Sequence, residues 1–142
     1  MLVAEILKGK GDAVFTLAPD ASLNDACAEL ERRQVGALIV CEGDGVAGVL
    51  SERDIVRELG RSGVSCLSAR GTSLMTAKLV SCAGGDTTID ILQRMTDGRF
   101  RHMPVIENGE MLAIITLGDV VKARLQELHA EKSALEGMIM GH

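Results

Sequence analysis

Two stretches of this sequence decide its fold: "GVLSERDIV", residues 48–56, and "AIITLGDVV", residues 113–121. In each, an apolar run ends in a hydroxyl residue, and an aspartate follows three positions later. The pairs are Ser51 with Asp54, and Thr116 with Asp119. When the two aspartates, 65 residues apart, are aligned, Val40 also falls on Val105. The sequence therefore predicts a tandem duplication.

Both copies predict the same series of elements: strand, helix, strand, strand, helix. In the first copy, apolar residues at helical spacing follow the cap candidates Asp20 and Ser22, and a continuous apolar run is typical of a buried strand. The elements expected there are a strand at 14–17, a helix within 19–34, strands at 36–41 and 46–50, and a helix from Ser51. Those expected in the second copy are a strand at 79–82, a helix at 87–99, strands at 103–106 and 111–115, and a helix from Thr116.

This pattern predicts an α+β fold of two repeats. We assign repeat 1 to residues 1–60 and repeat 2 to residues 73–128. Residues 61–72 are rich in Gly and Ser and are predicted to be the linker. Residues 129–142 are predicted to be a C-terminal helical extension.

Composition excludes several classes of function. The formal net charge is −5, Trp and Tyr are absent, and the aromatic residues are Phe15 and Phe100, so neither a basic surface nor stacking platforms for nucleic acid are expected. No apolar run reaches the roughly 18 residues of a membrane span, and the N-terminal segment lacks a signal-peptide pattern. We therefore expect a cytoplasmic protein that binds neither nucleic acid nor membrane.

Cysteine and histidine spacing does not indicate a catalytic or metal site. The cysteines are far apart, without a CxxC pair, so they are interpreted as small buried apolar residues. The three histidines are also far apart, and the GxSxG, HExxH and GxxxxGK[ST] motifs are absent. We expect no enzyme, no catalytic residues, no catalytic cofactor and no metal site.

The duplicated hydroxyl-x-x-Asp motif has two interpretations. In the first, it is a capping box, in which the hydroxyl accepts from an early helix N–H group and the acid favours the helix dipole. In the second, the carboxylate at a helix N-terminus beside a strand end accepts the hydroxyl groups of a ribose. One motif alone favours the cap, and duplication copies caps as faithfully as binding sites.

The complete set of motifs resembles a tandem pair of cystathionine β-synthase (CBS) domains, the Bateman module. The resemblance rests on the two stretches quoted above and on "PDASLNDA", "GDTTIDIL", "VGALIV" and above all "RFRHMPV", in the same order in both copies. It covers roughly residues 1–128, and the chain resembles the small stand-alone bacterial members that consist of the pair alone. It implies that the two repeats pack about a pseudo-two-fold axis.

The resemblance also implies two clefts for adenosine-containing ligands such as AMP, ATP, NAD or S-adenosylmethionine. It would place Ser51 and Asp54 in one cleft with the segment from Phe100 to Pro104. The residues of that segment are Phe100, Arg101, His102, Met103 and Pro104. The other cleft would hold Thr116, Asp119, Thr16, Val35, Gly36 and Ala37.

By this resemblance, aspartate holds the ribose, apolar residues flank the adenine, and Arg101 with His102 meets phosphate. Arg53, whose charge opposes the dipole in its predicted first helical turn, would also gain from a nearby anion. The second cleft has Gly36, Ala37 and Gly118 at the matching places, so unequal affinities are expected.

The C-terminal stretch bears on assembly. Positions 121, 125, 128, 132, 135 and 139 step by four and three, and all but Lys132 are apolar. This seam suits either cover for the body of its own chain or pairing in a dimer, and the family resemblance favours a homodimer.

Taken together, the sequence predicts a regulatory sensor that binds an adenine nucleotide, AMP or NAD before ATP, and relays ligand state to an unknown regulated protein. The alternatives are a structural dimerisation domain without ligand and, less favoured, a nucleotide-using enzyme.

Overall fold

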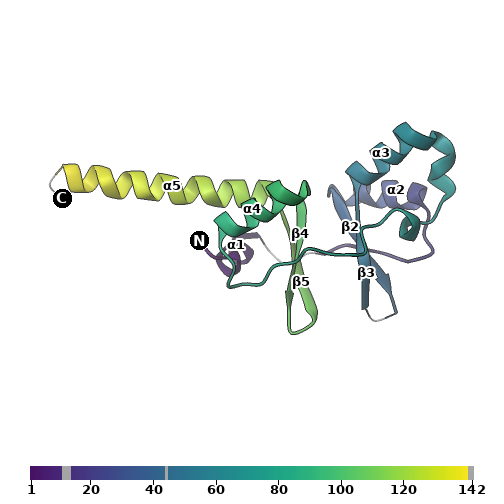
Figure 1. The fold of residues 1–142 in the computed structure, drawn as a ribbon, viewed down its shortest axis with the longest axis horizontal. Coiled ribbons are helices and arrows are strands. Elements are labelled where there is room, and N and C mark those ends of the chain that lie inside the picture. Colours follow the sequence, from purple (N-terminus) through teal and green to yellow (C-terminus); the bar gives the residue numbers. More distant parts are fainter. Residues whose placement is uncertain (11–13, 44, 141–142) are drawn as a thin grey trace. The chain divides into compact units, whose positions relative to one another are not determined.

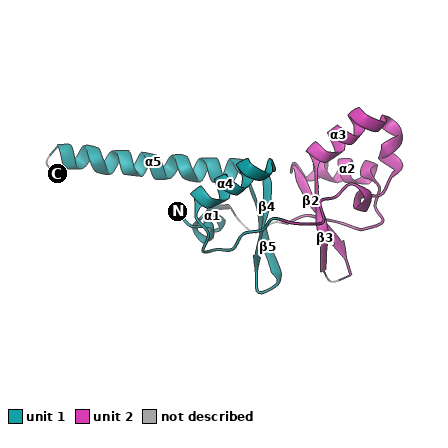
Figure 2. Cartoon of the chain, viewed as in Figure 1, with its two compact units in different colours: residues 1–13, 80–142 teal, residues 14–79 magenta. Residues whose placement is uncertain are grey.

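The computed structural model describes residues 1–10, 14–43 and 45–140. The chain forms two compact units: unit 1, residues 1–13 and 80–142, and unit 2, residues 14–79 (Figure 2). Each unit contains an antiparallel pair of strands with helices beside it (Figure 1). The predicted α+β class is confirmed.

Unit 2 holds the first copy of the repeat. Its elements are β1 (Thr16–Leu17), α2 (Leu23–Arg33), β2 (Ala37–Glu42), β3 (Gly45–Ser51), α3 (Glu52–Ser62) and two 3₁₀ helices, η1 (Val64–Ser68) and η2 (Gly71–Ser73). The sheet order is β1-β2-β3, with β1 parallel and β3 antiparallel to β2. The predicted helix within 19–34 starts from Ser22, whose side chain accepts from the Asp25 N–H in a capping box.

Unit 1 holds the second copy together with the N-terminal segment. Its elements are α1 (Val3–Lys10), α4 (Thr88–Gly98), β4 (His102–Glu107), β5 (Glu110–Thr116) and α5 (Leu117–Ile139). β4 and β5 are antiparallel, and the Asn-Gly turn between them has positive φ at Asn108 and Gly109, as a tight hairpin turn requires. α5 is continuous, so the predicted C-terminal extension belongs to the same helix as the second hydroxyl-x-x-Asp motif.

The duplication is visible in the strand registers. Leu17 pairs in parallel with Val40 in unit 2, and Cys82 pairs in parallel with Val105 in unit 1. Both hairpins also have a register shift directly after that valine. Matching irregularities at matching positions support descent of both copies from one repeat.

The predicted strand at 79–82 is wrong, because only Cys82 forms a bridge there. In the first copy, the Ile39 N–H donates to the Phe15 carbonyl at 2.9 Å and extends the parallel pairing. The second copy has Pro104 at the position of Ile39, and proline has no N–H to donate. The pairing is therefore limited to the bonds at Cys82, which donates to Pro104 and accepts from Ile106.

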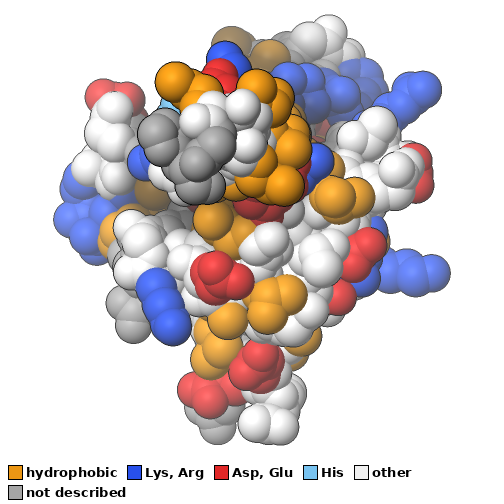
Figure 3. Space-filling model, turned by 90° about the vertical axis from the view of Figure 1, so that its left-hand side faces the viewer, with side chains coloured by type: hydrophobic (Ala, Val, Ile, Leu, Met, Phe, Trp, Pro, Cys, Tyr) orange, Lys and Arg blue, Asp and Glu red, His pale blue; other side chains and the backbone are white. Residues whose placement is uncertain are grey.

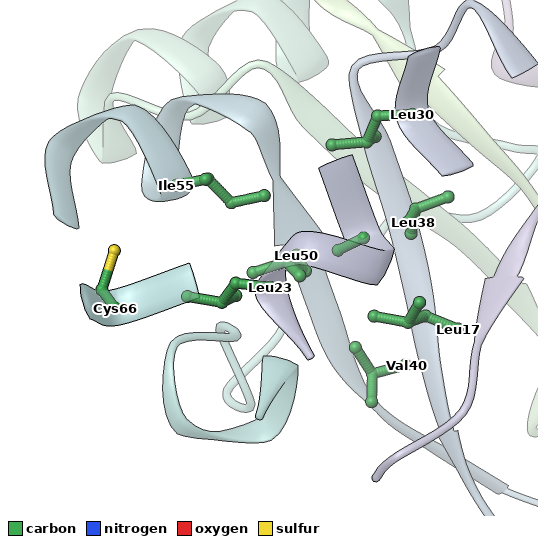
Figure 4. Packing of buried hydrophobic residues seen from close by; sticks show 9 residues of the cluster. Leu17, Leu23, Leu30, Leu38, Val40, Leu50, Ile55 and Cys66 are labelled. Atoms are coloured by element: carbon green, nitrogen blue, oxygen red, sulfur yellow. The ribbon is translucent and has the colours of Figure 1, made fainter. Parts of the chain in front are cut away.

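The core of unit 2 lies between α2, α3 and the sheet. Figure 4 shows Leu50 of β3 among leucines from α2 and β2. The buried members are Leu17, Leu23, Ala26, Leu30, Leu38, Val40, Leu50, Ile55 and Cys66. A Cβ atom at Gly48 would lie 2.6 Å from the Thr76 carbonyl oxygen, because Thr76 forms a bridge with Val49. Glycine is therefore required where the chain after η2 crosses β3.

The core of unit 1 combines α1, α4, the hairpin and the start of α5. Its buried members are Val3, Cys82, Ile91, Met95, Met103, Val105, Ile115 and Val120. Val3 lies near the start of the chain and the other members lie within residues 82–120, so the unit depends on contacts that are remote in sequence.

Residues 61–72, predicted to be the linker, are ordered into the end of α3 and the two 3₁₀ helices. Cys66 of η1 is buried against the unit 2 core. The Leu23 N–H donates to the Ala69 carbonyl at 2.8 Å, and the Gly71 N–H donates to the Ala21 carbonyl at 2.9 Å. These bonds fix the Ser- and Gly-rich segment against the start of α2.

The N-terminal residues, assigned to repeat 1 by sequence order, pack with the second copy. Val3 is fully buried in the unit 1 core, and its N–H donates to the Asp86 carbonyl at 2.9 Å. Leu2 forms an antiparallel bridge with Thr87. The helix α1, which the sequence assigns to repeat 1, thus contacts residues of repeat 2.

Candidate nucleotide-binding residues

Ser51 and Asp54 form a capping box at the start of α3. The Asp54 N–H donates to Ser51 Oγ at 3.2 Å, and the Ser51 N–H and hydroxyl both donate to Asp54 Oδ2, at 3.2 and 2.8 Å. All three of these bonds within the described chain use Ser51 Oγ or Asp54 Oδ2, and none uses Asp54 Oδ1. The predicted cap is confirmed, and this half-buried carboxylate retains an oxygen that can accept from a ligand.

The start of β2 lies beside this cap. Ala37 pairs with Ser51 across the hairpin, and the Glu52 N–H donates to the Gly36 carbonyl at 2.9 Å. Val35 and Gly36 are half-buried, whereas Ala37 is buried. Unit 2 therefore places the predicted site residues Val35, Gly36 and Ala37 next to the hydroxyl end of β3.

Two further predicted site residues of unit 2 have exposed side chains. Thr16 lies on β1 opposite Ile39, two residues along β2 from Ala37. Arg53 lies in the first turn of α3, between the two capping residues. Its guanidinium is accessible to an anion near the helix N-terminus.

The second motif repeats this geometry at the start of α5. The Asp119 N–H donates to Thr116 Oγ1 at 3.1 Å, and the Thr116 N–H donates to Asp119 Oδ2 at 2.9 Å. This capping box is also confirmed. Both copies thus present a half-buried hydroxyl and a half-buried carboxylate at the junction of a strand with a helix N-terminus.

The basic segment of unit 1 lies beside Thr116. His102 pairs with Thr116 across the β4–β5 hairpin, and the Leu117 N–H donates to the Arg101 carbonyl at 2.8 Å. Arg101 is exposed and His102 is half-buried. Arg101 and His102 are therefore next to the second hydroxyl within their own unit.

The apolar residues of the same segment pack into unit 1. Met103 is fully buried in the core, and Pro104 is buried. Phe100 is half-buried, and a Cβ atom at Gly98 would clash with its ring. Gly98 therefore makes room for the ring at the end of α4, and Met103 is a core residue within this unit.

The family resemblance places each hydroxyl-x-x-Asp motif with the corresponding segment of the other repeat. The structure brings together the motif and the segment that belong to one repeat: Gly36 and Ala37 with Ser51, and Arg101 and His102 with Thr116. The pairing across repeats stays a prediction.

Unit 2 also has a groove of about 470 Å³ between α2 and α3. It shares Val35 and Gly36 with the predicted site, but Ser51 and Asp54 are not among its lining residues. Leu30, Ile55, Val56 and Leu59 form its apolar part. This groove is distinct from the capping box.

A polar cluster that the sequence analysis missed surrounds Glu127 of α5. The Thr88 hydroxyl donates to Glu127 Oε1 at 2.8 Å, Arg124 donates to Oε2 at 2.8 Å, and the Met1 ammonium forms an ion pair with Oε1. Burial acts to raise the pKa of Glu127, but these hydrogen bonds outweigh it and hold the pKa at about 2. The ionised carboxylate therefore joins α4, α5 and the N-terminal residue.

Replacing Glu127 with Gln is expected to lower the free energy of unfolding at pH 7 by about 1–2 kcal/mol, after allowance for solvent screening. Because the folded pKa of about 2 lies below the reference value of 4.5, the carboxylate stabilises the fold above pH 4.5, and this contribution falls as pH drops towards 2. Denaturant titrations of parent and variant should therefore converge between pH 4.5 and pH 2. A constant difference across that window would contradict this role for Glu127.

The cysteines and acids do not assemble a metal site in the part of the chain that the structure describes. Cys66 and Cys82 are buried, as predicted, whereas Cys27 and Cys41 are half-buried. Burial is the main cause that raises the pKa of Cys82, to about 11. None of the helices in residues 1–10, 14–43 and 45–140 is both long and apolar enough to cross a membrane.

This architecture defines the class of the protein: two copies of one α+β repeat, each with a hydroxyl-x-x-Asp capping box at a strand-to-helix junction. The sequence profile of the CBS domain matches residues 4–61 and 71–126. The chain belongs to the CBS-domain family and contains a tandem pair of these domains.

Similar proteins agree with this assignment. The chain is 31% identical to the CBS domain-containing protein CBSX3, mitochondrial, of Arabidopsis thaliana, over 98% of this chain and 72% of that protein. It is 29% identical to Arabidopsis CBSCBSPB5 over 72% of this chain, but spans only 19% of that protein.

Solved structures also match the fold. The CBS-domain containing protein ATU1752 of Agrobacterium tumefaciens is 41% identical, with a TM-score of 0.85 over 87% of this chain and 99% of that one. A Burkholderia ambifaria protein, described as a candidate signal-transduction protein with CBS domains, is 32% identical, with a TM-score of 0.83 over 89% of this chain and 95% of that one.

Proposed function

We propose that this protein is a regulatory sensor that binds an adenosine-containing nucleotide through its hydroxyl-x-x-Asp motifs and relays ligand state to a partner protein. The observation that carries the proposal is the half-buried Asp54 carboxylate, which a capping box holds beside a helix N-terminus through bonds that use Oδ2 and leave Oδ1 to accept from a ligand. A cytoplasmic location and a non-catalytic role are parts of this proposal.

In the proposed complex, Asp54 accepts hydrogen bonds from the two ribose hydroxyls. A charge-assisted bond of this kind is stronger than a bond between neutral groups. The capping box fixes the carboxylate before the ligand arrives, so little side-chain freedom is lost on binding. Asp119 takes the same role in the second copy, with Thr116 as its hydroxyl partner.

Arg101, His102 and Arg53 are the proposed phosphate ligands. Arg101 and Arg53 are exposed, and cationic side chains suit a monophosphate or the diphosphate bridge of a dinucleotide. A triphosphate would bring more negative charge to a chain that already carries −5. We therefore propose that AMP or NAD binds more tightly than ATP, with S-adenosylmethionine as a further candidate ligand.

The adenine base is proposed to lie against apolar residues of the segments that precede β2 and β4. Val35 and Phe100 are half-buried and keep accessible surface for a flat ring. The backbone of Gly36 and Ala37, with Thr16 nearby on β1, would complete the less basic of the two sites. The buried Met103 and Pro104 would act by supporting the segment that carries Arg101 and His102.

A homodimer is the proposed form in which ligand state is relayed. A ligand shifts a conformational equilibrium only by its differential affinity for the two states, so the relay requires a contact that differs between them. The description of the Burkholderia relative as a candidate signal-transduction protein supports a regulatory role. The regulated partner is proposed to be a protein that responds to the ligand-dependent change in the dimer.

Absorbance gives a direct test, because the chain has neither Trp nor Tyr. We expect a band near 260 nm from bound adenine after the protein has been loaded with AMP or NAD and desalted. A spectrum without that band for AMP, NAD and ATP alike would favour a structural dimerisation domain. Conversion of the bound nucleotide to a product would favour an enzyme.

A further inference from the structure

The C-terminal half of α5 carries an apolar seam that its own unit leaves exposed. Val120 and Ala123 form the buried face of the helix, and successive residues are about 100° apart, so Val121 and Leu125 point to a different side. The exposed fractions along the seam are 41% for Val121, 61% for Leu125, 44% for Leu128, 59% for Leu135 and 84% for Ile139. The body of unit 1 therefore does not bury this seam.

The view along α5 from its C-terminal end shows hydrophobic side chains gathered on the helix (Figure 3). Within unit 1, the helix continues well beyond α4 and the β4–β5 hairpin (Figure 2). The seam therefore runs along a helix that is anchored at one end and free of its own unit at the other.

We propose that this seam pairs with the same seam of a second copy, with the two helices antiparallel. The proposal rests on the homodimer proposed above and adds its orientation and register. In this register Val121 packs against Ile139 of the second copy, and Leu125 packs against Leu135. Leu128 then lies against Lys132 of the second copy. Because the dimer has a two-fold axis, each of these three pairs of residues occurs twice, once on each side of the axis.

The order of charges along α5 favours this orientation. Lys122 flanks the start of the seam and Glu136 flanks its end, and both are exposed. Antiparallel pairing brings Lys122 of each copy to Glu136 of the other, on the same side of the seam. Within one copy, Glu136 has only a 3.9 Å contact with the exposed Lys132, which is too weak to prevent this exchange.

Parallel pairing would be opposed by the same residues. It would stack Lys132 on Lys132 of the second copy at the centre of the seam, and it would bring Glu131 close to Glu136 on both sides. In the antiparallel register, Lys132 instead lays its alkyl stem along Leu128 and keeps its ammonium in water. The one unfavourable contact in this register is between Glu131 of one copy and Glu131 of the other, and it occurs once per dimer.

The seam also needs the rest of the protein. It spans fewer than three heptads, too few to sustain a coiled coil between isolated peptides. Because the start of α5 is fixed in unit 1 by Val120, Ala123 and the Glu127 cluster, the helix is already formed before pairing. The pairing therefore loses less conformational entropy than two free segments would.

Charge reversal in the full chain tests the proposal by sedimentation equilibrium at low salt. We expect the parent to be a dimer, and Lys122→Glu or Glu136→Lys alone to raise the dimer dissociation constant about fivefold or more, since each change affects two contacts. The double variant Lys122→Glu/Glu136→Lys should return to within about twofold of the parent. Lys8→Glu on α1, an equal change in net charge on an exposed residue, is the control and should leave the constant unchanged.

Each other outcome overturns a defined part of the account. A parent that dimerises but is unaffected by Leu128→Ser/Leu135→Ser would keep the homodimer and overturn the pairing through α5. Single variants without effect, or a double variant as weak as either single one, would overturn the antiparallel register. A monomeric parent at about 100 μM would overturn the homodimer itself, whereas its nucleotide binding would still be judged by the band near 260 nm.

Discussion

Replacing Asp54 with Asn is expected to weaken AMP binding about tenfold or more, because the neutral amide loses a charge-assisted hydrogen bond to the ribose, worth about 1.5–3 kcal/mol. Asn has the same shape, and its amide oxygen can still accept from the Ser51 N–H, so the melting temperature of the ligand-free protein should change little. Isothermal titration of parent and variant with AMP measures the first effect, and calorimetry without ligand measures the second.

The chain offers a matched control for this variant. Ser22 and Asp25 form the same capping box at the start of α2, with the Asp25 N–H at 3.0 Å from Ser22 Oγ and the Ser22 N–H at 3.2 Å from Asp25 Oδ2. Asp25→Asn should therefore reproduce any capping effect and leave AMP affinity unchanged. If Asp54→Asn lowers the melting temperature and spares affinity, Asp54 is a cap only.

Leu50→Ala is expected to have the largest effect on stability, a loss of about 2–5 kcal/mol in the free energy of unfolding. Leu50 is fully buried, and Figure 4 shows it at the centre of the unit 2 cluster, so its removal leaves a cavity that the rigid sheet cannot close. Denaturant unfolding followed by far-ultraviolet circular dichroism measures the loss.

Val56→Ala is the control for the core variant, because Val56 lies on α3 and is 65% exposed. It should change the free energy of unfolding by no more than about 0.5 kcal/mol. Comparable losses in the two variants would show that the β2–β3 hairpin and its helices do not form the core described above.

Local pattern predicted most of the fold. The helix starts at Ser22, Ser51 and Thr116 follow from a hydroxyl three positions before an acid, and the structure has a capping box at each. Both hairpins follow from apolar runs around short turns. The strand at 79–82 could not be excluded in this way, because its pairing depends on whether Pro104, remote in sequence, can donate a hydrogen bond.

Long-range contacts explain the other differences. The position of α1 depends on Val3 entering the core of the second copy, which no local pattern indicates. Residues 61–72 are predicted to be the linker from their Gly and Ser content, and Cys66 and Gly71 of this segment are buried in unit 2. The order of this segment depends on tertiary packing, which its composition does not indicate.

The candidate site shows the same division. The motifs predicted which hydroxyls and acids cap helices, and the register of each hairpin places the preceding segment beside them. The Glu127 cluster was missed because Thr88 and Glu127 are 39 residues apart. A usable signal was present, since Thr88 lies on the same helical face as Ile91 and Met95 and is buried with them.

The contact between ribose and carboxylate is the central claim, and comparing AMP with 2′,3′-dideoxy-AMP by isothermal titration tests it most directly. Both ligands carry the same base and phosphate, so a difference reports the ribose hydroxyls. We predict that the parent binds the dideoxy ligand about tenfold or more weakly than AMP, and that Asp54→Asn/Asp119→Asn reduces this difference to about threefold or less. Equal affinities of the parent for the two ligands, or no binding of AMP, would contradict the account.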